Sequence, residues 1–187
     1  MKNSKIVKFM ALAGQEVAQS FDPRSEAERK LGAQLLLSEV LEYVINGLGV
    51  IPEVNGIKIT KPDDLHYHAE AEPNQLEMLD GLADVAYTMY WNQSAFGLPL
   101  EAGFDLVCDN NLEKFVKLSG WATGKRELSR DEWNCKLDVT WPPEVTVVQV
   151  VHFEGEPYAV GKDSRGKVRK PSTYKPVDLC QLLHQAS

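Results

Sequence analysis

Two pairs of acidic residues have the spacing of one helical turn, and they carry the clearest chemical signal in the sequence. Glu39 and Glu42 are three positions apart, and Asp80 and Asp84 are four positions apart. Residues at either spacing lie on the same face of an α-helix. Carboxylate oxygens are the hard ligands that Mg²⁺ prefers. Two helices that face each other with these acids would therefore form a magnesium site able to act on phosphates.

The same spacing also occurs on ordinary solvated helix faces, and the residues alone leave both interpretations open. Leu31 and Leu35 lie on the same arc of the helix as Glu39 and Glu42. A solvated face would not need these leucines, whereas ionised acids on a buried helix must be solvated, paired with a cation or bound to a metal. The apolar surroundings shift the balance toward the metal site.

Four helices are expected to carry and surround these acids, because apolar residues recur at helical spacing between prolines and glycines. The predicted helices cover residues 4–18, 25 to 47 or 49, 73–96 and 99–118. Ser25 and Glu28 fit a capping box at the start of the second helix. Residues 51–71, between the second and third helices, are predicted to form a loop with a short hairpin at Gly56.

The C-terminal part of the chain has a different character. Residues 145–153 are rich in β-branched side chains, and a turn at Gly155 leads to residues 158–160, which predicts a β-hairpin. A basic segment follows, with Asp163 as its one acid. Its cations are Lys162, Arg165, Lys167, Arg169, Lys170 and Lys175.

Composition excludes several classes of protein. The chain has 187 residues, of which 43% are hydrophobic and 25% charged, and its formal net charge is −7. This charge argues against a nucleic-acid partner, because phosphate binding depends largely on Lys and Arg. No apolar run approaches the roughly 20 residues that a membrane-spanning helix needs, so no membrane partner is expected. Three scattered cysteines, Cys108, Cys135 and Cys180, predict free thiols in the cytoplasm.

Four segments, in order along the chain, resemble the all-α nucleoside triphosphate pyrophosphohydrolases of the MazG and phosphoribosyl-ATP pyrophosphohydrolase type. The first two resemble the EExxE element and the second acidic element of that family. The third resembles an S-N-x-x-K-F helix end, and the fourth a GKV-x-K-P-x-x-Y tail. The segments are residues 36–43 (LLSEVLEY), 80–87 (DGLADVAY), 109–115 (DNNLEKF) and 166–174 (GKVRKPSTY).

The resemblance implies hydrolysis of an NTP or dNTP between the α- and β-phosphates, which yields a monophosphate and pyrophosphate and controls a nucleotide pool. It implies Mg²⁺ as cofactor, with Mn²⁺ able to substitute. Glu39 and Glu42 would be catalytic, with Glu39 orienting the attacking water. Metal ligands would be Glu39, Glu42, Asp80 and Asp84.

The substrate-binding candidates come from four parts of the chain. They are Asn111, Lys114, Lys167, Lys170, Gln34 and Trp91. The first four would contact the phosphates or the sugar, although a polar helix end and a mobile basic tail are the alternatives. Gln34 and Trp91, together with Phe9 and Tyr87, are candidates for recognition of the base, but aromatic residues at helical spacing more often belong to a core.

The sequence departs from the family at two positions. Ser38 stands at the first acid of EExxE, and Gly81 stands where many relatives have the Glu of an ExxD pair. Either Asp80 or Glu77 would then complete the site with Asp84. These departures keep other functions open: a non-catalytic nucleotide-binding or interaction module, and hydrolysis of phosphoribosyl-ATP. His66 and His68 are interpreted as surface histidines rather than zinc ligands.

These arguments predict a mainly α fold, a four-helix MazG-like bundle with a C-terminal mixed extension that contains a β-hairpin. Residues 1–118 would form the helical catalytic domain, and residues 119–187 the extension with its basic tail. The resemblance also implies a homodimer or homotetramer acting on a nucleoside triphosphate, in the cytoplasm or, for a phage-encoded protein, in the host cytoplasm.

Overall fold

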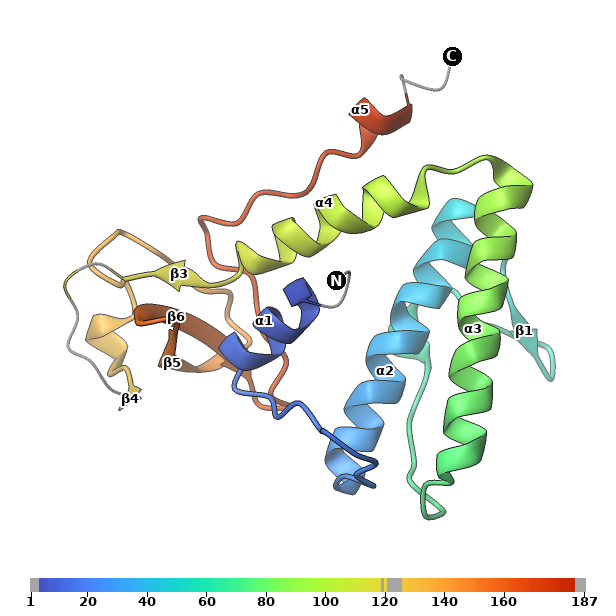
Figure 1. Ribbon diagram of the computed structural model, residues 1–187, viewed down its shortest axis with the longest axis horizontal. Coiled ribbons are helices and arrows are strands. Elements are labelled where there is room, and N and C mark those ends of the chain that lie inside the picture. Colours follow the sequence, from blue (N-terminus) through green and yellow to red (C-terminus); the bar gives the residue numbers. More distant parts are fainter. Residues whose placement is uncertain (1–3, 119, 121–125, 184–187) are drawn as a thin grey trace. The chain divides into compact units, whose positions relative to one another are not determined.

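In the computed structural model, which describes residues 4–118, 120 and 126–183, helices and small antiparallel sheets are mixed along the chain (Figure 1). The helices are α1 (Ser4–Leu12), α2 (Glu26–Glu42), α3 (Gln75–Phe96), α4 (Leu100–Leu112) and α5 (Cys180–Leu183). The strands are β1 (Glu53–Val54), β2 (Ile57–Lys58), β3 (Val116–Lys117), β4 (Arg126–Glu127), β5 (Val145–Phe153) and β6 (Glu156–Asp163). No helix in the described part of the chain is long and apolar enough to cross a membrane.

The chain forms two compact units. Unit 1 contains Met1–Gln19 and Val85–Ser187, and unit 2 contains Ser20–Asp84. The division lies within α3, so that this helix contributes to both units. It differs from the predicted boundary at residue 118, because Phe115 and Leu118 pack in the apolar clusters of the sheet and tie the end of α4 to it.

The larger sheet belongs to unit 1 and has the strand order β3-β6-β5-β4, with antiparallel neighbours. The predicted hairpin is confirmed, because β5 and β6 pair from Phe153 and Glu156 to the opposite end. Glu154 and Gly155 have positive φ angles of 53° and 81°. Such angles at both central residues are typical of the tight turns that join antiparallel strands, and glycine adopts them readily.

Both faces of the β5–β6 hairpin are buried, which explains why β5 lacks the alternation of a half-exposed strand. On one face, Val150 and Ala159 pack with residues of the 128–141 segment, Trp133 and Trp141 among them. On the other face, the neighbouring Val151 and Val160 pack with a second cluster, whose further buried members are Leu12, Ala13, Phe115 and Val168. Helix α1 therefore covers one side of the hairpin, and the segment before β5 covers the other.

Unit 2 contains the two features that local sequence signals predict. The capping box is confirmed: the Glu28 backbone N–H donates to Ser25 Oγ at 3.3 Å, and the Ser25 N–H donates to Glu28 Oε2 at 3.0 Å. A short hairpin, β1–β2, turns at Asn55 and Gly56, which both have positive φ. Helix α2 passes directly into a π-helical turn at Tyr43–Gly47, which the sequence did not predict.

Unit 2 has almost no core of its own. In Ser20–Asp84, all of which the structure describes, Leu41 is the one buried side chain. On α3, Leu76, Leu79 and Leu82 are 70%, 68% and 62% exposed. A domain of about 60 residues normally buries about 60% of the surface of its unfolded chain. Unit 2 alone therefore lacks the burial that would make it stable.

The predicted mainly α four-helix bundle is wrong. The described residues are 44% helical and 15% strand, and they include a four-stranded sheet. Helix α1, expected in the bundle, packs instead with α4 and β5, because Leu12 and Ala13 join the apolar cluster on the hairpin. Apolar periodicity identifies which face of a helix becomes buried, but not the surface that buries it.

The described cysteines are free thiols, as predicted. Cys108 and Cys135 are buried and Cys180 is exposed. Burial raises the pKa of the Cys135 thiol to about 11, which keeps it protonated and unreactive at neutral pH.

We predict that Gly161→Ala destabilises unit 1. A Cβ added at Gly161 would lie 2.7 Å from Cζ3 of Trp141 and closer still to another ring carbon, so the indole must move out of the apolar cluster. The expected loss is about 1–3 kcal/mol, measured as the free energy of unfolding in urea.

Gly103→Ala in α4 is the matched control, because its Cβ would lie at an ordinary 3.9 Å from Leu182 Cδ1. This helical substitution should be neutral or stabilising by up to about 1 kcal/mol. Equal stability of Gly161→Ala and the wild type would contradict the packing of Trp141 on β6.

Candidate functional site

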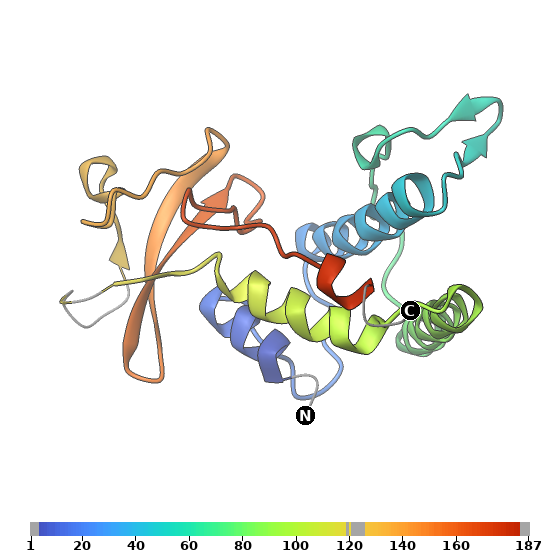
Figure 2. The ribbon, with the colours of Figure 1, turned by 90° about the horizontal axis from the view of Figure 1, so that it is seen from above.

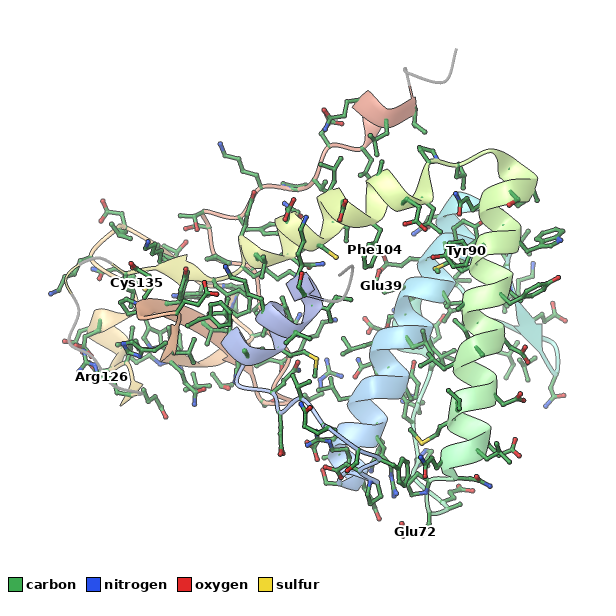
Figure 3. All side chains as sticks on the ribbon, in the orientation of Figure 1. Glu39, Glu72, Tyr90, Phe104, Arg126 and Cys135 are labelled. Atoms are coloured by element: carbon green, nitrogen blue, oxygen red, sulfur yellow. The ribbon has the colours of Figure 1, made fainter. Side chains whose placement is uncertain are left out.

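The first acidic pair lies on the last turns of α2. Glu39 and Glu42 are both exposed, and Glu39 projects from the side of the helix (Figure 3). The π-helical turn begins at Tyr43, immediately after Glu42. Single π-helical turns are frequent at functional sites, where they change the direction of neighbouring side chains. The only local sequence signal for this turn is the pair of glycines, Gly47 and Gly49, that ends the helix.

The second acidic pair lies in the first half of α3. Asp80 and Asp84 are exposed, and so is Glu77, the alternative ligand. The start of α3 is marked by Asn74, whose side-chain oxygen accepts the Leu76 N–H at 3.0 Å. All these acids therefore lie on helices, at the predicted spacing and open to solvent.

The two pairs are not gathered into one group of metal ligands. Among the described residues, no three His, Cys, Asp or Glu side chains are grouped so that they could hold a metal ion. The described His66 and His68 are exposed. An ion pair joins Arg29 of α2 to Glu72 in the segment before α3, with Nη1 and Oε2 3.4 Å apart. As arranged here, the four carboxylates do not fit a Mg²⁺ ligand set.

At the end of α4, Asn111 and Lys114 lie one turn apart, as predicted. The Lys114 N–H donates to Asn111 O at 3.3 Å, and Lys114 Nζ lies 5.7 Å from the centre of the Phe9 ring. Phe9 packs edge-on against Phe115, with their ring centres 5.1 Å apart, beside the cluster on the hairpin. Phe9 is therefore part of a core and not a platform for a base.

The remaining candidates for base recognition lie in different units. Tyr87 and Trp91 belong to the part of α3 in unit 1 and are 70% and 57% exposed. Gln34 is half-buried on α2 in unit 2. The two aromatic rings are thus not core residues of the chain, although aromatic residues at helical spacing usually are.

The basic segment is held in a defined conformation by Asp163. Its Oδ1 accepts the N–H groups of Arg165 and Lys167, both at 2.9 Å. Its Oδ2 accepts Nε and Nη2 of Arg169 at 3.0 and 2.7 Å. Burial alone would raise the pKa of this carboxyl, but the Lys167 N–H and the Arg169 guanidinium hold it below its ordinary value.

The sequence did not single out Asn110, which the structure places between α4 and the basic segment. Asn110 is only 9% exposed. Its Nδ2 donates to the backbone oxygen of Lys175 at 2.7 Å, and its Oδ1 accepts the hydroxyl of Tyr174. The sequence around Asn110 gives no local signal for this contact, because it joins Asn110 to residues more than 60 positions away.

Comparisons with known proteins give no match, whether with family models, with curated proteins or with solved structures.

We predict that Asp163→Asn destabilises the protein by about 2–3 kcal/mol at pH 7, because the Arg169 guanidinium loses its partly buried partner. The folded pKa of Asp163 lies below the unfolded value. Its contribution is therefore complete above that unfolded value, near pH 4, and is lost as the pH falls through the folded pKa. The stability difference between variant and wild type should shrink below about pH 4.

Urea unfolding between pH 2 and pH 7 measures this difference. Glu144→Gln, at an exposed position before β5, is the control and should leave stability within about 0.5 kcal/mol. A stability difference for Asp163→Asn that stays constant down to pH 2 would contradict the assigned role of the carboxylate.

Proposed function

We propose that the protein is a nucleoside triphosphate pyrophosphohydrolase. The proposal is supported by the order of the four family-like segments along the chain and by the elements on which they lie. Exposed acid pairs lie on α2 and α3, the polar pair Asn111 and Lys114 lies at the end of α4, and the basic segment is ordered by Asp163.

The proposed reaction is attack of water on the α-phosphorus of the substrate. The bond from the water oxygen to this phosphorus forms, and the bond from the phosphorus to the bridging oxygen breaks, so that pyrophosphate leaves. Glu39 holds the water by accepting one of its protons in a hydrogen bond and takes that proton as the new bond forms. Glu42 lies one turn away on the same face, where it can share this role.

Mg²⁺ enters this proposal through the resemblance alone. When bound, such an ion neutralises charge that develops on the phosphates. Because the described carboxylates are not gathered into a ligand set, no step of the reaction is assigned to the metal.

We further propose that the active form contains two or more copies of the chain. The support is the bare apolar surface of unit 2, where Leu41 is buried and Leu76, Leu79 and Leu82 are exposed. Helices with apolar residues on several sides are stable when other helices cover them. A second copy of the same chain is available wherever the protein is made, and symmetric dimers are the commonest assembly of soluble proteins.

The lack of a metal-ligand group among the described carboxylates favours a second candidate function, a module that binds a nucleotide without hydrolysing it. Exposed Tyr87 and Trp91 offer surfaces for stacking in either case.

An assay of pyrophosphate release from the eight common NTPs and dNTPs, with Mg²⁺, tests the function. We expect turnover of at least one nucleotide by the wild type, and a loss of at least about 100-fold in Glu42→Gln, because a carboxamide cannot accept a proton. Glu53→Gln is the control: it removes an exposed acid from β1 in the same unit and should leave the rate unchanged.

Background release from every nucleotide would overturn the hydrolase, and calorimetric binding of a nucleotide under the same conditions would then support the binding module. Near-normal release by a folded Glu42→Gln variant would remove Glu42 from the site.

We predict that the wild type sediments as a species larger than the 20.9 kDa monomer. The double variant Leu79→Asp, Leu82→Asp should shift it toward monomer or unfold it, because buried carboxylates are costly at an apolar interface. Leu137→Asp, at a 55% exposed position in unit 1, is the control and should leave the sedimentation unchanged. A monomeric wild type at about 100 μM would contradict self-association.

A further inference from the structure

The end of the basic segment is fixed to unit 1 from two sides. The Ser172 N–H donates to Thr140 O, and the Thr140 N–H donates to Ser172 Oγ, both at 2.9 Å. Two residues later, the Tyr174 hydroxyl donates to Asn110 Oδ1. Figures 1 and 2 show the chain after β6 running back along α4 toward α5. This stretch is therefore an ordered strap across α4.

Asn110 uses both ends of its amide in this contact. Its oxygen accepts from Tyr174, and its Nδ2 donates to Lys175 O at 2.7 Å, with Glu113 Oε2 at 3.4 Å as a weaker acceptor. A buried amide is stable only when its donors and acceptors are paired. The pairing thus sets where the backbone of Lys175 lies relative to α4.

Two lysines of the strap are linked to this contact, Lys170 through the ring of Tyr174 and Lys175 through its backbone oxygen. Lys170 Nζ lies 4.8 Å from the centre of the Tyr174 ring, a distance at which the ring face attracts an ammonium group. Lys175 follows Tyr174 directly, and its side chain is exposed. The Tyr174 side chain therefore connects the position of Lys170 to the anchor on α4.

Some of the acids near the anchor are paired with other cations. Lys5 Nζ lies 2.8 Å from Asp109 Oδ1 and 3.6 Å from Asp105 Oδ1, and Asp163 is paired with Arg169. Glu113 is the remaining acid in contact with Asn110, and it is exposed.

We propose that Asn110 and Tyr174 are positioning residues that hold Lys170 and the backbone of Lys175 at the end of α4, where the two lysines bind the phosphate chain of the substrate. The choice of a triphosphate rests on the proposed function. Cations fixed before binding lose less conformational freedom when the ligand arrives, so the anchor raises affinity for the anion. Lysines act on phosphates as point charges, so binding weakens as salt screens them.

Calorimetric titration of the full chain with inorganic triphosphate, in EDTA and at low salt, tests the proposal without hydrolysis. The wild type should bind. The double variant Lys170→Gln, Lys175→Gln should bind at least 10-fold more weakly. Lys58→Gln removes the same kind of charge from an exposed strand of unit 2, and it should bind within 2-fold of the wild type.

Tyr174→Phe separates positioning from simple charge, because it keeps the ring under Lys170 and removes only the hydroxyl that reaches Asn110. We expect a 3- to 10-fold weaker affinity for triphosphate and, in the pyrophosphate-release assay, a matching rise in KM with kcat nearly unchanged. A thermal melt checks that the variant is folded.

Three results would overturn the proposal: no binding of triphosphate by the wild type, wild-type affinity in the double lysine variant, or a Tyr174→Phe variant with lower thermal stability but unchanged affinity and KM. Binding that follows these variants without pyrophosphate release from any nucleotide would support the anion site and reject the hydrolase. Pyrophosphate release with wild-type KM in the double lysine variant would support the hydrolase and reject the anion site.

Discussion

The burial of both faces of the β5–β6 hairpin is the constraint on which unit 1 depends. Adjacent residues such as Val150 and Val151 point to opposite sides of a strand, so each side needs its own cover. The segment that contains Trp133 covers one side, and Leu12 of α1 covers the other. Because Phe115 belongs to the second cluster, the end of α4 is attached to the sheet as well. The helix that carries the polar candidates is thereby joined to the basic segment.

Unit 2 differs from unit 1, because it carries the acid pairs but buries few of its apolar side chains. Its helices begin and turn where capping and turn residues place them, yet its apolar side chains remain exposed. The hydrophobic effect supplies most of the free energy of folding, and local hydrogen bonds do not replace it. The acid pairs are therefore carried by the part of the protein whose burial is least complete, and self-association would cover the same helices that carry them.

The two groups of candidate residues differ in how firmly they are held. Around Asn110 and Asp163, side chains are buried, paired and fixed by contacts distant in sequence. Around Glu39 and Asp84, side chains are exposed and spaced only by their own helix. Groups fixed by buried hydrogen bonds keep a defined geometry, whereas exposed carboxylates on incompletely packed helices are positioned only by their own helix.

Sequence by itself determined the local features of this protein. The capping box at Ser25, the hairpin at Gly56 and the β5–β6 hairpin follow from residues a few positions apart, because backbone geometry and nearby hydrogen bonds decide them. Spacing also placed Glu39 with Glu42 on one helix face. The function and the metal are proposed from a resemblance, and self-association is proposed also from the exposed leucines of unit 2.

Tertiary structure alone decided which surfaces meet. It placed α1 on the sheet and not in a helical bundle, did not group the described acid pairs as metal ligands, and brought Tyr174 to Asn110. The physical reason is that the spacing of apolar residues shows which helix face is apolar, and residue type shows where the acids are. Neither determines which segment of the chain that face or acid will contact. That contact depends on the shape and burial of segments far apart in the chain.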